Sequence, residues 1–452
     1  MMITRTREPI MLFFGDILFF SIALWVTLWV RYISVPKSTL LYNHFLAFSF
    51  LFGLWVLVFF IVGLYDKHTV FFKKKLPSII IQAQLTNIAF AAVFFFFIPT
   101  FGITPKTNLV VYLLISSFLI LLWRLVLFPL IGFSKKQNAI LIGGGKDATE
   151  IITEVNNNSR YNLSFTLVVD LEKVTNPNDI QKNVLEAVGM GTTSVVVCDT
   201  RNSQLEQLLP LLYNLSFLHT PFRFIDIHKV YEGIFDRISL SFIRYEWFLE
   251  NVDSSPKIVY GFVKRTIDIV IALVLFVVTL PFLPLVWFAV WFDDGGPLFI
   301  TQERVGKHNQ SIKIIKFRTL SGDDKGDEVL NSTLESTTVG AFLRKSRIDE
   351  FPQLWNVLKG DLSLVGPRPE LPALAHHYSE KIPYYNTRHL IKPGLSGWAQ
   401  IYHDQHPHHG SDVAETRTKL SYDIYYLKNR SILLDLNIAL KTVKKLLTIS
   451  GV

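Results

Sequence analysis

Long apolar runs are the feature that most constrains this chain of 452 residues, because each is long enough to cross a membrane. Four of them follow one another at roughly residues 11–31, 43–65, 79–98 and 109–131. A helix needs about 20 mostly apolar residues to span a hydrocarbon core of ~30 Å. Half of all residues are hydrophobic and 37 are Phe, which agrees with a membrane protein. The runs predict a four-helix transmembrane bundle over residues 1–134.

Basic residues beside these runs predict their orientation. Cytoplasmic loops of membrane proteins carry an excess of Lys and Arg. Such residues gather before the first run, between the second and third, and after the fourth: Arg5, Arg7, Lys67, Lys73, Lys74, Lys75, Lys135 and Lys136. Both ends of the bundle are therefore expected in the cytoplasm. Asp16 and Arg124 lie inside runs, where charges are candidates for function, but a buried pair between helices is the favoured interpretation.

The charge and the cysteine content narrow the class of protein. The formal net charge is +8 and the isoelectric point is about 9.2. In a membrane protein such an excess indicates a basic cytoplasmic face and an anionic lipid or substrate. The sequence contains no recognisable DNA- or RNA-binding motif, so nucleic acid is not an expected partner. Cys198 is the only cysteine, which excludes an internal disulfide, and it ends a run typical of a buried strand.

After the fourth run the pattern changes to short apolar strands that alternate with polar helices. The first helix is expected at 146–157. The strands are expected at 138–142, 163–170, 193–199 and 222–226. Alternation of this kind predicts a truncated Rossmann-like parallel α/β domain, which occupies residues 135–256 together with its linker.

The first turn of this domain fits a dinucleotide-binding fingerprint. Gly143 and Gly145 match the pattern G-x-G-x-x-A between a strand and a helix, and Asp170 ends the second strand, where an acid binds ribose. These three residues are candidates for binding a nucleotide. The domain is only about half of a full dinucleotide fold, however. A structural or regulatory role is therefore favoured over nucleotide binding.

A fifth apolar run, residues 266–292, is interrupted by Pro281. Proline removes a backbone donor and clashes with the preceding turn, which splits the run into segments of about 22 and 16 Å. Neither segment spans a bilayer alone. Basic residues lie on both sides of the run, which favours a re-entrant helix over a single kinked span. Lys264 and Asp268, four residues apart, are expected to pair at the interface.

Two adjacent carboxylates, Asp349 and Glu350, are the strongest candidates for chemistry. A helix is expected to begin at them, because Pro352 suits a first turn and Gly360 suits a C-terminal cap. A helix N-terminus stabilises ionised acids, and these can attack phosphorus or hold Mg²⁺. Arg344 adds positive charge one turn upstream. Such a pair alone is more often a helix cap with local salt bridges. The surrounding residues therefore decide between a cap and a catalytic site.

The segment 258–447 resembles the bacterial sugar transferase family, monotopic phosphoglycosyltransferases that act on polyprenyl phosphate. The matching stretches follow in order: 264–268, 296–299, 302–306, 316–319, 343–361, 363–370, 392–400 and 422–426. The four spans and the truncated Rossmann-like domain also resemble the large members of this family, which include galactose- and glucose-1-phosphate transferases. The resemblance implies a mainly α catalytic domain over residues 257–452, anchored by the re-entrant, proline-broken helix.

The resemblance also implies a two-step phosphoryl transfer. Asp349 would attack the sugar-linked phosphorus of a UDP-sugar and release UMP, which leaves a phosphosugar on the aspartate. Polyprenyl phosphate, such as undecaprenyl phosphate, would then accept the phosphosugar. Glu350 would share with Asp349 the binding of Mg²⁺. The residues expected to bind the substrate phosphates are Arg304, Lys316, Arg318, Arg344, Gly366, Pro367 and Arg368.

The same resemblance implies a multi-pass protein of the bacterial inner membrane, with the lipid bilayer as partner and the catalytic domain facing the cytoplasm. A second copy of the chain is a further candidate partner, because half-folds such as the middle domain often pair. A non-enzymatic membrane nucleotide sensor that uses the Gly-rich turn is the alternative function. A one-step displacement is the alternative mechanism. The sequence leaves the sugar open among glucose, galactose and N-acetylated amino sugars.

Overall fold

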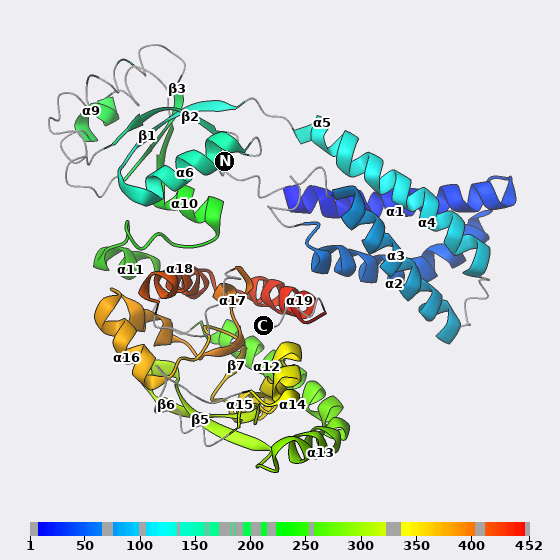
Figure 1. Ribbon diagram of the computed structural model, residues 1–452. Helices are drawn as coiled ribbons and strands as arrows, with labels where there is room; N and C mark the ends of the chain where they lie inside the picture. Colours follow the sequence, from blue (N-terminus) through cyan, green and yellow to red (C-terminus); the bar gives the residue numbers. More distant parts are fainter. Residues whose placement is uncertain are drawn as a thin grey trace. The chain divides into compact units, whose positions relative to one another are not determined.

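The structure is a computed structural model with two compact units. It describes residues 8–65, 76–98, 105–132, 136–158, 161, 163–170, 182, 186, 193–199, 209–214, 223–252, 257–321, 336–402 and 412–447. Unit 1 comprises Met1–Cys198 and Ser203–Ile225, and unit 2 comprises Asp199–Asn202 and Asp226–Val452. Most of the described elements are helices (Figure 1).

The four apolar runs at the start of the chain form the predicted helices: α1 (Glu8–Tyr32), α2 (Ser38–Val62), α3 (Leu76–Phe97) and α4 (Pro105–Leu122). A π-helical turn, Trp123–Leu127, joins α4 to α5 (Phe128–Gly132). Helices α1 and α3 each pack against both α2 and α4. Their shared core contains Phe20, Trp55 and Tyr112. These helical stretches are long and apolar enough to cross a membrane, and their placement in one stays a prediction.

The two charged side chains inside the apolar runs form the expected buried pair. Arg124 Nη2 lies 2.5 Å from Asp16 Oδ2, and Arg124 Nε donates to Oδ1 at 3.1 Å. The Tyr65 hydroxyl donates to the same carboxylate at 2.7 Å. Arg124 also donates to the carbonyl of Leu64 at 2.8 Å. The interpretation as an interhelical pair is confirmed, because each buried charge is compensated by the other.

Unit 1 also contains a small parallel sheet made of the predicted strands: β1 (Gln137–Ile142), β2 (Leu163–Val169), β3 (Thr193–Cys198) and β4 (Arg223–Asp226). The order is β2-β1-β3-β4, and β1 runs parallel to both of its neighbours. Helix α6 (Gly145–Asn157) follows β1 as predicted and packs against β2, and α9 (Leu209–Asn214) precedes β4. The Rossmann-like interpretation of this sheet stays a prediction.

Helices α10 (Ile227–Phe235) and α11 (Tyr245–Asn251) pack within unit 2. Trp247 lies in one hydrophobic cluster with Tyr378 and Ile424, and the indole of Trp398 donates to the carbonyl of Asp236 at 2.8 Å. These contacts attach residues 226–252 to the unit that contains the predicted catalytic segment, although the sequence pattern places them in the middle domain. The division into three domains stays a prediction.

The fifth apolar run forms two helices separated by a turn. Helix α12 (Ile258–Thr279) ends at a 3-10 turn, Leu280–Phe282, and α13 (Leu283–Asp294) begins after it. Pro281 occupies this turn, where its missing N–H interrupts the helical hydrogen bonds. Figure 1 shows α12 and α13 meeting at a bend. The re-entrant course through a membrane stays a prediction.

The predicted pairing of Lys264 with Asp268 is wrong. Lys264 Nζ binds Asp435 Oδ2 at 3.0 Å instead. Asp268 accepts from Ser363 Oγ at 2.8 Å and from Leu364 N at 3.2 Å. Asp268 is buried, and a buried carboxylate is satisfied better by two fixed donors than by one flexible lysine. The start of α12 is therefore tied to residues 363–364 and 435 of unit 2.

The remaining elements of unit 2 surround the predicted site. They include the antiparallel hairpin β5–β6 and the short parallel pair β7–β8. Their bounds are β5 (Phe299–Val305), η6 (Lys307–Asn309), β6 (Ser311–Phe317), α14 (Thr338–Ser346), η7 (Ile348–Glu350), α15 (Gln353–Lys359), β7 (Ser363–Val365), α16 (Pro372–Lys381), η8 (Tyr385–Leu390), β8 (Gly394–Ser396), α17 (Trp398–Tyr402), α18 (Val413–Asn429) and α19 (Ile432–Leu447).

Candidate active site

Asp349 and Glu350 lie in η7, a tight turn between two helices. Helix α14 is capped by Thr337, whose hydroxyl accepts a backbone N–H of the first turn at 3.0 Å. The helix ends at Arg347, which has a φ of 55°, a left-handed conformation that stops a right-handed helix. Helix α15 begins only at Gln353. The helix therefore starts later than predicted, after the two acids. We call the turn Ile348–Glu350 the acid turn.

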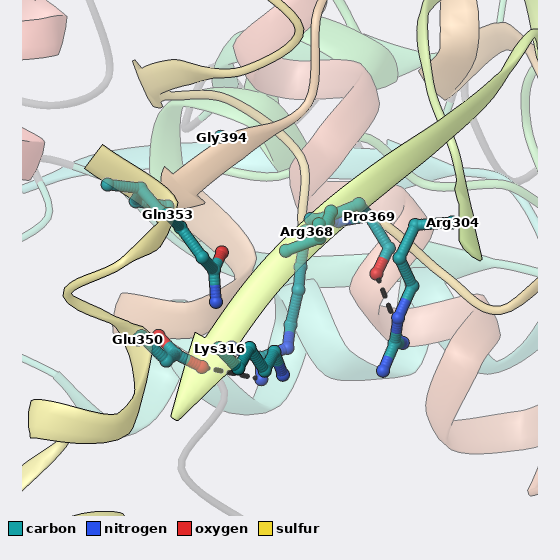
Figure 2. A pocket seen from close by; sticks show the side chains of 9 residues that line it. Arg304, Lys316, Glu350, Gln353, Arg368, Pro369 and Gly394 are labelled. Carbon is teal, nitrogen blue, oxygen red and sulfur yellow. Dashed lines mark hydrogen bonds and ion pairs between the residues drawn. The ribbon is translucent and has the colours of Figure 1, made fainter. Parts of the chain in front are cut away.

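Three basic side chains line one pocket with Glu350. Lys316 comes from β6, Arg304 from β5 and Arg368 from the loop after β7. Figure 2 shows Glu350, Lys316 and Arg368 pointing toward one another, and Arg368 Nη2 lies 3.0 Å from Glu350 Oε1. The fold thus brings three predicted phosphate-binding cations to one predicted acid. The other residues that line the pocket are Ile314, Gln353, Pro369, Gly394 and Leu395.

Burial and neighbouring charges affect the two acids differently. Burial, with a contribution from the Glu350 charge, raises the pKa of Asp349 to about 6, against the opposing charges of Lys316 and Arg344. Burial also favours the neutral form of Glu350, but the charges of Arg368 and Lys316 outweigh it and hold the pKa of Glu350 below its ordinary value. Glu350 is therefore ionised at neutral pH, whereas Asp349 exchanges its proton close to the physiological range.

Lys316 and Arg368 respond differently to the same pocket. Burial lowers the pKa of the Lys316 ammonium to about 8, while the Glu350 charge opposes this shift. The pKa of Arg368 is raised, chiefly by the Glu350 carboxylate. The pocket therefore combines a permanent positive charge with one that is lost in moderately alkaline solution.

The other two predicted phosphate-binding cations lie in different surroundings. Arg344 Nε donates to Thr319 Oγ1 at 2.9 Å, and Arg344 is near enough to Asp349 to oppose the rise of its pKa. Arg318 Nε donates to a nearby backbone carbonyl at 3.1 Å, and its guanidinium occupies the space that a Cβ on Gly296 would need. Arg344 therefore borders the acid turn, whereas Arg318 packs against the loop that precedes β5.

Gly366 and Pro367 make backbone hydrogen bonds to the segment that contains β8. Gly366 N donates to Ser396 O at 2.8 Å, and Gly394 N donates to Pro367 O at 2.9 Å. A Cβ on Gly366 would lie 2.6 Å from Lys392 O, so a larger residue does not fit at this close approach. Their contact with a substrate diphosphate stays a prediction.

Sequence reasoning did not single out two buried polar side chains of α15. Gln353 is only 4% exposed and lines the pocket near Glu350. Asn356 Nδ2 donates to Lys313 O at 2.7 Å, and its Oδ1 accepts from Ile315 N at 3.1 Å. These bonds fix α15 against β6. The sequence did contain a signal for these two residues. An amide on the apolar side of a helix needs a hydrogen-bond partner, which indicates a buried polar contact.

The two acids are the residues that could hold Mg²⁺. Within the described residues, no group of three or more His, Cys, Asp and Glu side chains is arranged to bind a metal ion. Mg²⁺ usually binds through one or two carboxylates together with substrate phosphate oxygens. Asp349 and Glu350 are the carboxylates that could share such an ion with the substrate, and the binding of Mg²⁺ stays a prediction.

The three candidate nucleotide-binding residues lie in unit 1. Gly145 opens α6 with a φ of 84°, and Gly143 N donates to Val169 O at 3.0 Å. Ile142 and Val169 are register partners in parallel strands, so the Gly-rich turn and Asp170 lie at the same carboxyl edge of the sheet. The fold brings these predicted residues together, and their binding of a nucleotide stays a prediction.

Known proteins match this chain over the segment that contains the pocket. The bacterial sugar transferase family matches residues 259–449. A UDP-N-acetylgalactosamine-undecaprenyl-phosphate N-acetylgalactosaminephosphotransferase of Aeromonas hydrophila is 33% identical over 62% of this chain and 65% of its own. A UDP-glucose:undecaprenyl-phosphate glucose-1-phosphate transferase of Caulobacter vibrioides is 38% identical over 43% of this chain and 73% of its own. An undecaprenyl-phosphate galactose phosphotransferase of Salmonella typhimurium is 33% identical over 42% of this chain and 41% of its own.

These matches differ in extent but share one region. The chain spans somewhat less than two thirds of the Aeromonas relative and nearly three quarters of the Caulobacter relative. The family segment contains the broken apolar helix, the acid turn and every residue that lines the pocket. This chain therefore belongs to the bacterial sugar transferase family.

Proposed function

We propose that this protein transfers a hexose 1-phosphate from a UDP-sugar to undecaprenyl (polyprenyl) phosphate and releases UMP, which starts the assembly of a surface polysaccharide or glycan. The observation that carries the proposal is the pocket where Glu350 meets Lys316 and Arg368 beside Asp349. Phosphoryl transfer is catalysed chiefly by positioning and by stabilisation of charge, and this pocket supplies both. The names of the three relatives describe transferases of the same kind.

Asp349 is the proposed nucleophile. Its carboxylate oxygen forms a bond to the sugar-linked phosphorus, the bond from that phosphorus to the bridging oxygen breaks, and UMP leaves with the electron pair. An oxygen of polyprenyl phosphate then attacks the same phosphorus, and the aspartate carboxylate leaves. With a pKa of about 6, Asp349 is mostly ionised at pH 7. Its elevated basicity makes it a better nucleophile than an ordinary aspartate.

The basic side chains are proposed to bind the two phosphates of the donor. Arg368 suits this role because a planar guanidinium pairs with two oxygens at once. Lys316 supplies a compact charge beside it, and Arg304 stands at the edge of the pocket, where its Nη2 donates to Gln302 Oε1 at 2.8 Å. Mg²⁺ held by Asp349 and Glu350 would reduce the negative charge of the diphosphate.

The broken helix is proposed to enter and leave the bilayer through one leaflet. Ala272 of α12 packs against Val357 of α15, and Val290 of α13 packs against Leu343 of α14. A straight span would carry α13 across a core of ~30 Å, away from these partners. Contacts of both halves with the same unit favour the re-entrant course. The catalytic unit would then lie on the cytoplasmic side of the inner membrane, where a soluble donor meets a lipid acceptor.

Release of UMP tests the proposed function. The full-length protein would be placed in vesicles with undecaprenyl phosphate and offered UDP-glucose, UDP-galactose and the two common UDP-N-acetylhexosamines. We expect at least one donor to yield equal amounts of UMP and lipid-linked sugar diphosphate, and sustained turnover only when lipid phosphate is present. Release of UDP instead of UMP, or no product from any donor, would reject the proposal.

A non-enzymatic membrane nucleotide sensor is the competing function. The observation that favours it is the Gly-rich turn, which lies at the same sheet edge as Asp170. Tight nucleotide binding to unit 1 in a protein that releases no UMP would support it.

The pairing of two copies of the chain stays a prediction as well, and the mass of the detergent-solubilised protein tests it.

A further inference from the structure

A second cluster of charged side chains lies behind the loop that carries Arg368. Arg388, in η8, is 5% exposed, and Asp423, in α18, is 1% exposed. Arg388 Nη2 lies 2.9 Å from Asp423 Oδ2, and Arg388 Nη1 donates to the Tyr385 hydroxyl at 2.8 Å. These three residues stand outside the set that lines the pocket.

Arg388 contacts the pocket loop at two points. Its Nη2 donates to the carbonyl of Arg368 at 3.0 Å, and its Nη1 lies 3.7 Å from Glu370 Oε1. The side chain of Arg368 pairs in turn with Glu350 at 3.0 Å. Arg388 therefore fixes the backbone of the residue whose guanidinium reaches the acid turn.

The burial of this cluster needs an explanation beyond stability. Removing two charges from water is unfavourable, and a buried ion pair often adds little to the free energy of folding. A guanidinium, however, offers several donors in fixed directions. Arg388 donates to a carbonyl and a hydroxyl and lies within ion-pair distance of two carboxylates. Asp423 compensates its charge, so that the guanidinium remains in the interior behind the loop.

We propose that Arg388 and Asp423 are positioning residues that set where the side chain of Arg368 meets the donor diphosphate. This inference rests on the proposed function, in which Arg368 binds phosphate oxygens. Neither residue touches the substrate, and both act through the backbone of Arg368. Small displacements matter here, because a shift of ~1 Å in a binding group can lower a rate by ~100-fold.

The substitution Asp423→Asn tests the proposal because it removes the charge and keeps the size of the side chain. In the full-length protein we expect a roughly tenfold rise in the Kd for UDP, measured by calorimetry, and a similar fall in kcat/KM for sugar transfer. In an Arg368→Ala background, the same substitution should change the Kd and kcat/KM by less than about twofold. Equal losses in the two backgrounds would overturn the proposal, because they would indicate a general effect on the fold.

A matched control is available on the same helix. Lys428 of α18 pairs with Glu232 of α10 at 2.6 Å, so Glu232→Gln breaks an ion pair that holds α18 from another side. We expect UDP affinity and turnover to stay unchanged in this variant. If it loses as much UDP affinity as Asp423→Asn, the effect of Asp423 is not specific to the Arg368 loop and the proposal fails.

Two milder variants keep the test decisive if Asp423→Asn does not fold. Tyr385→Phe removes only one hydroxyl acceptor from Arg388, and it should raise the Kd for UDP by about twofold in the natural background but not with Arg368→Ala. Arg388→Lys keeps the charge but lacks the fork, so it should restore thermal stability relative to Arg388→Ala without restoring UDP affinity. Recovery of both would overturn the proposal. Absence of UMP release by the unmodified protein would reject the proposed function instead.

Discussion

Two turns of this chain carry patterns suited to phosphate chemistry, one in each unit. The Gly-rich turn of unit 1 offers backbone geometry, since Gly145 has a φ of 84° and opens α6. The acid turn of unit 2 lies where side chains from separate elements meet, with Lys316 on β6 and Arg368 after β7. A Gly-rich turn is a local pattern that close packing alone can require. Charges that converge from distant positions have no such simple explanation, because their burial opposes folding unless they are compensated.

Among changes to the acid turn, substitution of Asp349 is expected to reduce sugar transfer the most. Asp349→Asn removes the proposed nucleophile and keeps the volume, so kcat/KM should fall by at least ~1,000-fold. UMP release in vesicles measures it. The control is Asp361→Asn, which removes another carboxylate of unit 2, one paired with Lys359 at 3.0 Å. If the two variants lose similar activity, the loss in Asp349→Asn is not specific to the acid turn, and the prediction fails.

Removal of divalent cations is expected to have the next largest effect. A metal held by Asp349 and Glu350 would stabilise charge on the diphosphate, so chelation should lower kcat by ~100-fold, and added Mg²⁺ should restore it. Turnover at a series of free Mg²⁺ concentrations checks this. Full activity in excess chelator would show that the basic side chains of the pocket suffice.

The pH dependence of kcat/KM sharpens the account of the pocket. The pKa of Asp349 is raised to about 6, so the ionised form of this proposed nucleophile is lost as the pH falls below this value, and kcat/KM should drop ~10-fold per pH unit there. The pKa of Lys316 is lowered to about 8, so its charge is lost as the pH rises above this value, and kcat/KM should decline again. A profile that stays flat from pH 5 to pH 9 would contradict these assignments.

The Gly-rich turn is expected to give the smallest effect on turnover. Gly145→Ala places a Cβ on a residue with positive φ, which destabilises unit 1 by about 1 kcal/mol. Sugar transfer per folded molecule should change by less than about twofold, because this turn takes no part in the proposed reaction. Measured turnover is compared with the thermal unfolding of the same sample. A loss of turnover as large as that of Asp349→Asn would show that the Gly-rich turn is needed for sugar transfer, against this comparison.

Local patterns predicted the elements of this fold well. The first four apolar runs became α1 to α4, and the short strands became β1 to β4. These patterns depend on residues close in sequence, which periodicity reports directly. The helix start at Asp349 was placed too early because a left-handed Arg347 carries no signal in composition.

Partners distant in sequence could not be predicted from spacing. Lys264 stands four residues from Asp268, yet it binds Asp435, far along the chain. Gly366, a predicted phosphate-binding residue, also lies close to the backbone of Lys392, a contact that spacing did not indicate. The role of Asn356 depends on the packing of α15 against β6, which occurs only in the folded protein. Such contacts depend on tertiary packing, which the pattern of a single sequence does not reveal.

The central claim is that the Asp349 carboxylate itself forms a bond to the phosphorus of the donor. Incubation with a UDP-sugar labelled in the sugar, without acceptor lipid, followed by acid quench and peptide mass spectrometry, tests it most directly. The account predicts one phosphosugar on the peptide that contains Asp349, released when polyprenyl phosphate is added before the quench, and none with Asp349→Asn. A fully active sample that carries no label, or carries it on another residue, would contradict the account and favour a one-step displacement or a different nucleophile.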